Sequence, residues 1–166
     1  MIRWLLWRFE IPIWRIWWLL RAKHLVGVFV AVIDDTDNIL IIRKKRGVAL
    51  GWQLPGGGKD HTLSPHQGAA EELFEETGIR AFSLHQLPTI YNARHWDMKI
   101  PFLCMIYSGP IQVRDTFEIA EAKFISIKHM DEYLSGDCLE IARSAVYLHK
   151  KKCNLPRIVN HSRFTS

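Results

Sequence analysis

The residues best suited to chemistry are four glutamates that lie within six positions, in the segment 71–78. On a helix, Glu72, Glu75 and Glu76 stand at i, i+3 and i+4, so their carboxylates converge on one face. Like charges at these spacings repel, and the helix dipole disfavours negative charge in the last turns. A divalent cation would relieve both conflicts, and clustered carboxylates suit Mg²⁺ or Mn²⁺. We therefore predict a metal site at these three residues; the simpler alternative is a solvated acidic helix face.

A glycine triplet, Gly56, Gly57 and Gly58, follows Pro55 shortly before this acidic stretch. Glycine lets the backbone turn sharply and approach a ligand closely. A triplet alone is usually just a turn. Next to the acidic helix, it indicates a loop that binds phosphate beside a metal.

The helix that carries the glutamates has sequence signals at both ends. Ser64 is a preferred N-cap residue, Pro65 suits the first helical position, and Gln67 completes a capping box. Gly78 supplies the C-terminal stop. These signals predict a helix over Ser64–Thr77.

The remaining pattern predicts strands around this helix. A β-branched run over 26–33, turn residues over 34–38 and a second run over 39–46 predict a hairpin. Further expected elements are short strands at 52–54, 82–91, 100–107 and 122–127 and a last helix at 138–152. Strands interleaved with two helices predict one α/β domain with a mixed sheet.

The spacing of these residues resembles the signature of the Nudix hydrolases, G-x5-E-x7-R-E-U-x-E-E-x-G-U, where U is bulky and aliphatic. Gly57 begins the motif and Ile79 ends it. The resemblance implies a Nudix-like α/β/α sandwich, with a mixed β-sheet between helices, over residues 25–153. It also implies a hydrolase that uses Mg²⁺, or Mn²⁺, and cleaves a diphosphate linkage by water attack on phosphorus. The implied substrate is a nucleoside diphosphate linked to another moiety, such as a nucleoside triphosphate or a nucleotide sugar.

The sequence departs from the signature at two positions. Leu63 stands where the family has glutamate, and Glu71 stands where it has arginine. In the family the side chains at these two positions tend to pair. Losing both is less damaging than losing one, because no charge is left without its partner. The glutamates at 72, 75 and 76 are kept, which favours an active enzyme. The alternative is a catalytically weak or inactive nucleotide-binding module of the same fold.

A further carboxylate comes from the segment 118–124, which resembles the part of the family's chain that brings another acid to the metals. Glu118 is the candidate, as a metal ligand or as the base that activates water, and Glu121 is second. Glu72 is the other candidate for the base that accepts the proton.

Candidate substrate contacts are fewer. The basic run 43–46 closes the second strand, and alternation would direct two of its four side chains inward towards a polyanion. We take Arg43 and Arg46, with Gly56–Gly58, as candidate phosphate contacts. Trp96 is a candidate for stacking on a base.

Composition limits the class of protein. The chain has 166 residues, of which 48% are hydrophobic and 23% charged, as in one globular domain. Its net charge of +5 comes from two basic ends around an acidic middle, and no RNP, helix-turn-helix or KH pattern is present, so we expect no sequence-specific nucleic-acid binding. Three cysteines without a CxxC pair fit a reducing, cytoplasmic location.

The terminal segments stand apart from this domain. Residues 1–24 hold five of the seven tryptophans and five basic residues, interrupted by Pro12. No apolar run approaches the length of a membrane span. We expect an amphipathic segment that packs on the domain or across a homodimer, or that brings residues 1–23 into peripheral contact with an anionic membrane. Residues 154–166 are expected to be a basic tail.

Overall fold

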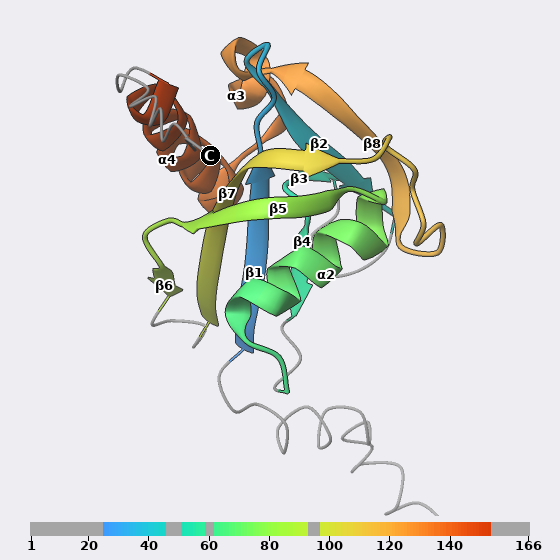
Figure 1. Ribbon diagram of the computed structural model, residues 1–166. Helices are drawn as coiled ribbons and strands as arrows, with labels where there is room; N and C mark the ends of the chain where they lie inside the picture. The colour runs from blue at the N-terminus through green and yellow to red at the C-terminus, as the bar shows by residue number, and fades with distance from the viewer. Residues whose placement is uncertain (1–24, 46–50, 59–61, 93–96, 154–166) are drawn as a thin grey trace, which may run out of the picture.

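The computed structural model describes residues 25–45, 51–58, 62–92 and 97–153. Figure 1 shows the elements along these ranges. The strands are β1 (Leu25–Val32), β2 (Asn38–Lys44), β3 (Gly51–Gln53), β4 (Gly56–Gly58), β5 (Arg80–Gln86), β6 (Ile90–Asn92), β7 (Asp97–Ser108) and β8 (Ile119–Ser126). The helices are α2 (Pro65–Thr77), the 3-10 helix η2 (Ile127–His129), α3 (Met130–Tyr133) and α4 (Gly136–Cys153).

The described strands form two sheets. The larger sheet has the order β4-β1-β7-β5, with β6 also beside β7. Strands β1 and β7 run parallel and the other pairs antiparallel, so this sheet is mixed. The smaller sheet, β3-β2-β8, is antiparallel throughout. The predicted class, an α/β domain with a mixed sheet between helices, is confirmed, with the strands divided between two sheets.

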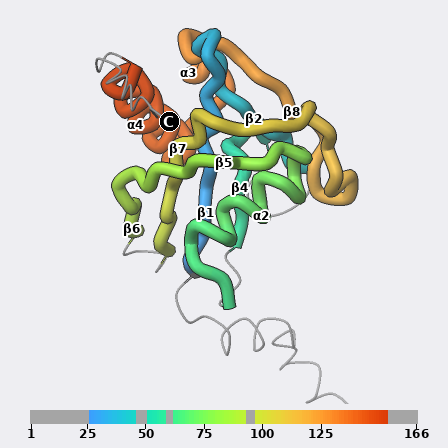
Figure 2. The backbone as a smooth tube through the Cα atoms, in the orientation of Figure 1, coloured from blue at the N-terminus to red at the C-terminus, as the bar shows by residue number. Residues whose placement is uncertain are grey.

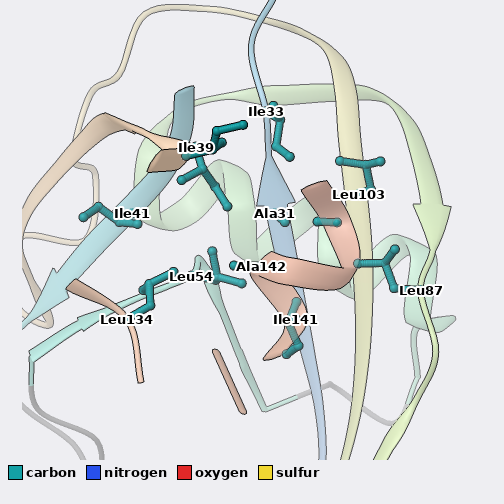
Figure 3. Packing of buried hydrophobic residues seen from close by; sticks show 12 residues of the cluster. Ala31, Ile33, Ile39, Ile41, Leu54, Leu87, Leu103, Leu134, Ile141 and Ala142 are labelled. Atoms are coloured by element: carbon teal, nitrogen blue, oxygen red, sulfur yellow. The ribbon is translucent and has the colours of Figure 1, made fainter. Parts of the chain in front are cut away.

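Helices α2 and α4 cover opposite faces of the larger sheet. Along β1 successive side chains alternate, so Val28 and Val30 pack with Leu73 of α2. On the other face Ala31 packs with Ile141 of α4, in the cluster of Figure 3. Because both faces of β1 are buried, its sequence is a continuous apolar run rather than an alternating one. The sheet thereby fixes the position of α2, the helix that carries the glutamates.

The predicted ends of helix α2 are confirmed. The Ser64 hydroxyl accepts a hydrogen bond from the Gln67 N–H at 3.2 Å, and the Gln67 side chain accepts one from the Ser64 N–H at 3.0 Å. Pro65 is the first helical residue. Gly78 adopts the left-handed conformation, with φ of 74°, and its N–H donates to the carbonyl of Phe74. The helix therefore begins after Ser64 and ends before Gly78, as the capping residues in the sequence predicted.

The predicted hairpin over residues 26–46 is wrong. Strands β1 and β2 follow one another in the chain, as the path in Figure 2 shows. They nevertheless belong to different sheets. An isolated bridge between Ile33 and Ile39 joins their adjacent ends. One edge of β1 pairs with β7 along its whole length and the other edge pairs with β4. Strand β2 pairs instead with β3 and β8.

Two further predictions about local structure need correction. The glycine triplet, predicted as a loop, is strand β4, in which Gly57 pairs with Val28. The single strand predicted over 82–91 is divided into β5 and β6, which both pair with β7. The last helix, α4, is confirmed.

No helix within the described ranges is long and apolar enough to cross a membrane. The expectations about residues 1–24 and 154–166 lie outside the described residues, as do those about Arg46 and Trp96.

Candidate active site

Helix α2 presents its four glutamates at different depths. Glu76 is buried, with 4% of its surface exposed, and Glu72 is half-buried. Glu71 and Glu75 are exposed. Since Leu73 fixes the helix to the sheet, Glu72 and Glu76, which are one turn apart, lie towards strand β4. Two of the four carboxylates, those of Glu72 and Glu76, therefore lie inward, and the other two lie at the surface.

Glu76 is held by two groups from other elements. Its Oε2 accepts a hydrogen bond of 2.7 Å from the backbone N–H of Gly56, and its Oε1 lies 3.1 Å from Nζ of Lys44. Burial raises the pKa of Glu76 from 4.5 to about 7, although Lys44 and the Gly56 N–H both favour the ionised form. The pKa of this buried carboxyl therefore lies above that of an exposed glutamate.

Glu72 lies directly against the glycine strand. A Cβ at Gly57 would stand 2.7 Å from Oε2 of Glu72, so only glycine leaves this carboxylate its place. Burial raises the pKa of Glu72, the Lys44 ammonium opposes this, and the carboxylates of Glu75 and Glu118 add to the increase. The pKa values of both inward glutamates are therefore shifted towards the neutral range.

The segment that follows β7 is tied to the C-terminal end of α2. The N–H of Gln112 donates to the carbonyl of Thr77 at 2.8 Å, and the N–H of Asp115 donates to the carbonyl of Glu75 at 3.2 Å. These bonds satisfy carbonyls that a helix end leaves without partners. The segment between β7 and β8 is thereby anchored beside the glutamates.

Glu118, at the end of this segment, is positioned by backbone hydrogen bonds. Oδ1 of Asp115 accepts hydrogen bonds from the N–H groups of Phe117 and Glu118, at 3.0 and 3.1 Å. The carbonyl of Glu118 accepts a 2.7 Å bond from the N–H of Lys45. Its carboxylate lies 3.9 Å from Nζ of Lys44. The predicted extra carboxylate therefore lies beside Lys44, partly open to solvent, and Asp115, which no sequence pattern singled out, holds its backbone.

Lys44 is the basic residue that the fold brings to the site. Its side chain is largely buried, with 14% exposed, and its Nζ contacts Glu76, Glu118 and the Gly56 carbonyl. The phosphate contacts predicted within the basic run 43–46 were Arg43 and Arg46 rather than Lys44. The signal was present, since alternation directs every second side chain of the run inward.

Arg43 and Glu121 form a separate pair. Their side chains make a 3.2 Å ion pair across the β2–β8 ladder, and the Arg43 guanidinium lies 5.7 Å from the ring centroid of Trp52. Glu121 also lies 3.7 Å from Nζ of Lys123. The fold therefore does not bring Arg43 or Glu121 to Glu72 and Glu76.

Of the two positions that depart from the signature, Leu63 lies just before helix α2 and Glu71 lies on its exposed face. Leu63 is half-buried next to the N-cap. Glu71 is exposed, and none of the described basic side chains lies within ion-pair distance of it. Glu71 therefore does not help to hold the inward carboxylates.

The described residues contain no group of three or more histidine, cysteine, aspartate or glutamate side chains arranged to hold a metal ion. The oxygens around Nζ of Lys44 nevertheless come from two carboxylates, those of Glu76 and Glu118, and from the backbone carbonyl of Gly56. These are the donor types that hard divalent cations take. The glutamate-bearing helix thus meets a glycine strand, rather than the predicted glycine loop, and Lys44 connects Glu118 to both.

A family model of the NUDIX domain matches residues 23–139, so the chain belongs to the Nudix family. The chain is 35% identical over 100 residues to the "Putative 8-oxo-dGTP diphosphatase" of Bacillus subtilis (strain 168), a match that covers 60% of this chain and 65% of that protein. It is 47% identical over 45 residues to an "RNA pyrophosphohydrolase" of Bartonella henselae, covering 27% of this chain and 23% of that protein. These matches span less than two thirds of either relative.

Solved structures show the same fold. The structure of a MutT NUDIX hydrolase from Burkholderia pseudomallei has a TM-score of 0.61 at 23% identity and covers 75% of this chain and 97% of that chain. The NUDIX domain of Shewanella oneidensis NrtR, in a cocrystal with ADP ribose, has a TM-score of 0.67 at 20% identity and covers 81% and 97%. At these identities the likeness supports the fold alone.

Proposed function

We propose that this protein is a divalent-metal-dependent hydrolase that cleaves a diphosphate linkage in a nucleoside diphosphate derivative by water attack on phosphorus. The observation that carries the proposal is that Glu72 and Glu76 lie against the glycine strand β4, while Lys44 contacts both Glu76 and Glu118. These carboxylates come from a helix and from a distant segment that is hydrogen-bonded to the end of that helix. A purely structural acidic surface would not need to bury Glu76 and half-bury Glu72.

The proposed metal is Mg²⁺, with Mn²⁺ as an alternative. Glu72, Glu75, Glu76 and Glu118 would hold it, because all supply hard carboxylate oxygens. When bound, the metal would neutralise phosphate charge and lower the pKa of the attacking water. The family membership and the donor types support this assignment.

Within this scheme the chain's own residues have distinct roles. Glu118 is half-exposed and accepts the proton of the attacking water; Glu72 is the second candidate for this role. A raised pKa brings the Glu72 carboxylate closer to the range in which a general base works best. Gly57 keeps the space that the Glu72 carboxylate occupies.

The proposed substrate is a nucleoside triphosphate or a nucleotide-sugar-like compound. The names of the relatives, an 8-oxo-dGTP diphosphatase and an RNA pyrophosphohydrolase, support phosphoanhydride substrates. The neighbour that binds ADP ribose supports including that compound. Gly56–Gly58, Arg46 and Trp96 remain proposed substrate contacts, whereas Arg43 would have to leave Glu121 to reach a phosphate.

The test is a phosphate-release panel with Mg²⁺ or Mn²⁺ over nucleoside triphosphates, nucleotide sugars, ADP-ribose and dinucleoside polyphosphates. We expect metal-dependent turnover of at least one compound, and Glu76→Gln and Glu118→Gln should each lower kcat by at least about a hundredfold. Turnover that needs no metal, or that both variants retain, would contradict the proposal.

The second candidate function is a nucleotide-binding module with little or no catalysis, which Leu63 and Glu71 favour. Restoring the signature with Leu63→Glu and Glu71→Arg separates the two functions. A large gain in kcat would indicate that the natural site is degenerate, whereas an unchanged kcat would indicate that the departures are neutral. Tight binding of a panel compound without turnover would support the binding module.

A further inference from the structure

The Lys44 ammonium has oxygen partners from three different parts of the fold. Its Nζ lies 3.1 Å from Glu76 of helix α2, 3.3 Å from the carbonyl of Gly56 in β4, and 3.9 Å from Glu118 of the segment before β8. Nζ donates a hydrogen bond to the Gly56 carbonyl, forms a close ion pair with Glu76 and lies at a longer ion-pair distance from Glu118. Lys44 is therefore the cation around which these elements meet.

Two of these three groups, the carboxylates of Glu76 and Glu118, are among those that the proposed function assigns to a divalent cation. A lysine ammonium and a hard metal ion compete for such oxygens, because both are attracted to the same negative charge. In the described structure the carboxylates of Glu76 and Glu118 both lie within ion-pair distance of Lys44.

We propose that Lys44 is the counter-cation of the metal-free site: its ammonium holds Glu76, Glu118 and the Gly56 carbonyl together, and binding of a divalent cation displaces it. This inference rests on the proposed function, because it concerns the same site. Lys44 keeps the carboxylates in place when no metal is bound and lowers the affinity of the site for the metal.

An ordinary structural ion pair would behave differently from this counter-cation. If Lys44 only stabilised the fold, its removal would disorder Glu76 and weaken metal binding. If it competes with the metal, its removal leaves two carboxylates uncompensated and strengthens metal binding. The sign of the change in metal affinity therefore separates the two roles.

The experiment measures Mn²⁺ binding to the full chain, without substrate, by electron paramagnetic resonance of free Mn²⁺. We expect Lys44→Met to lower the Kd for Mn²⁺ by at least about tenfold. The matched control is Lys45→Met, which removes the same charge from the next residue. Lys45 is exposed, and its Nζ contacts the carbonyl of Thr116 rather than the carboxylates, so its Kd should stay within about twofold of wild type.

Thermal unfolding supplies a second measurement. In EDTA, Lys44→Met should unfold at a lower temperature than wild type, because Glu76 loses its buried partner. Saturating Mn²⁺ should then raise its unfolding temperature by more than it raises that of wild type. If Lys44→Met does not fold, NMR of the lysine Nζ groups in the wild-type protein tests the same point. Mg²⁺ should shift the Lys44 signal and leave that of Lys45 unchanged.

The outcomes separate the inference from the proposed function. An Mn²⁺ affinity that is unchanged or weaker in Lys44→Met would overturn the inference alone. So would a Lys44 NMR signal that does not shift on addition of Mg²⁺ although the metal binds. Absence of Mn²⁺ binding by both wild type and variant would overturn the metal-dependent function as well.

Discussion

Gly57 lies against the carboxylate of Glu72, so that a Cβ at position 57 would stand 2.7 Å from Oε2. We expect Gly57→Ala to displace this carboxylate and to lower kcat by at least about tenfold, since small misplacements of a reacting group cost much in rate. The displaced atoms end a flexible side chain, so the free energy of unfolding should change by less than about 1 kcal/mol. Steady-state kinetics and urea unfolding would measure both quantities.

Gly58→Ala is the matched control for stability at this strand. A Cβ at Gly58 would meet nothing within 4 Å, and the residue needs no left-handed conformation. Its free energy of unfolding should equal or exceed that of wild type. Wild-type kcat in Gly57→Ala would show that the position of the Glu72 carboxylate does not matter for turnover.

Gly56 is constrained by the backbone rather than by a side chain. Its φ is 148°, and a Cβ there would stand 2.2 Å from the carbonyl oxygen of Val28. Strand β4 would have to move away from β1, so we expect Gly56→Ala to lower the free energy of unfolding by about 3 kcal/mol or more. Urea unfolding of Gly56→Ala beside Gly58→Ala measures this. Equal stability of the two variants would contradict the close pairing of β4 with β1.

Asp115 should affect turnover through Glu118. Asp115→Ala removes the acceptor of two backbone hydrogen bonds, which should cost about 1 kcal/mol of stability and lower kcat. Asp115→Asn keeps an oxygen at the acceptor position and is the conservative control, expected to retain most of the activity. In a Glu118→Gln background, Asp115→Ala should lower kcat no further. Additive losses in the double variant would show that Asp115 acts independently of Glu118.

The raised pKa of Glu76 predicts a pH dependence of stability in EDTA. The folded-state value is about 7 because of burial, against 4.5 for an exposed carboxyl. Between these values the folded protein retains a proton that the unfolded chain has lost. This contribution to stability is complete below pH 4.5 and is lost as the pH rises through about 7.

Glu76→Gln isolates this contribution. From pH 5 to pH 8, we expect the free energy of unfolding of wild type to fall by about 2 to 3 kcal/mol relative to that of the variant. Urea unfolding of both proteins in EDTA at the two pH values supplies the comparison. Parallel pH profiles would show that burial does not raise the pKa of Glu76.

Features that depend on neighbours in the chain could be predicted from the sequence. The hydrogen bonds between Ser64 and Gln67, and the left-handed turn at Gly78, act within a few residues of the helix ends. The spacing of Glu72 and Glu76 on one helix face follows from the helical repeat alone. These local effects explain why the acidic helix was predicted correctly.

Strand partners could not be predicted in the same way. The apolar runs of β1 and β2 and the turn between them fit a hairpin, but β1 is paired with β7 and β4. The direction of the basic side chains had the same difficulty. Alternation requires that Arg43 and Lys44 face opposite ways, but it does not decide which of them faces inward. In addition, the pairing of β2 with β8 shifts register between these two residues.

The sequence by itself predicted the acidic helix and the glycine segment before it, because the glutamates, the glycines and their spacing are local properties of one short segment. Only the tertiary structure decided which groups surround them. Lys44 reaches Glu76 from β2, and Glu118 is brought to Lys44 by the segment before β8 and by the hydrogen bond that connects Asp115 to the end of α2. Such contacts join residues tens of positions apart, and they depend on sheet pairing and burial, which no local pattern specifies.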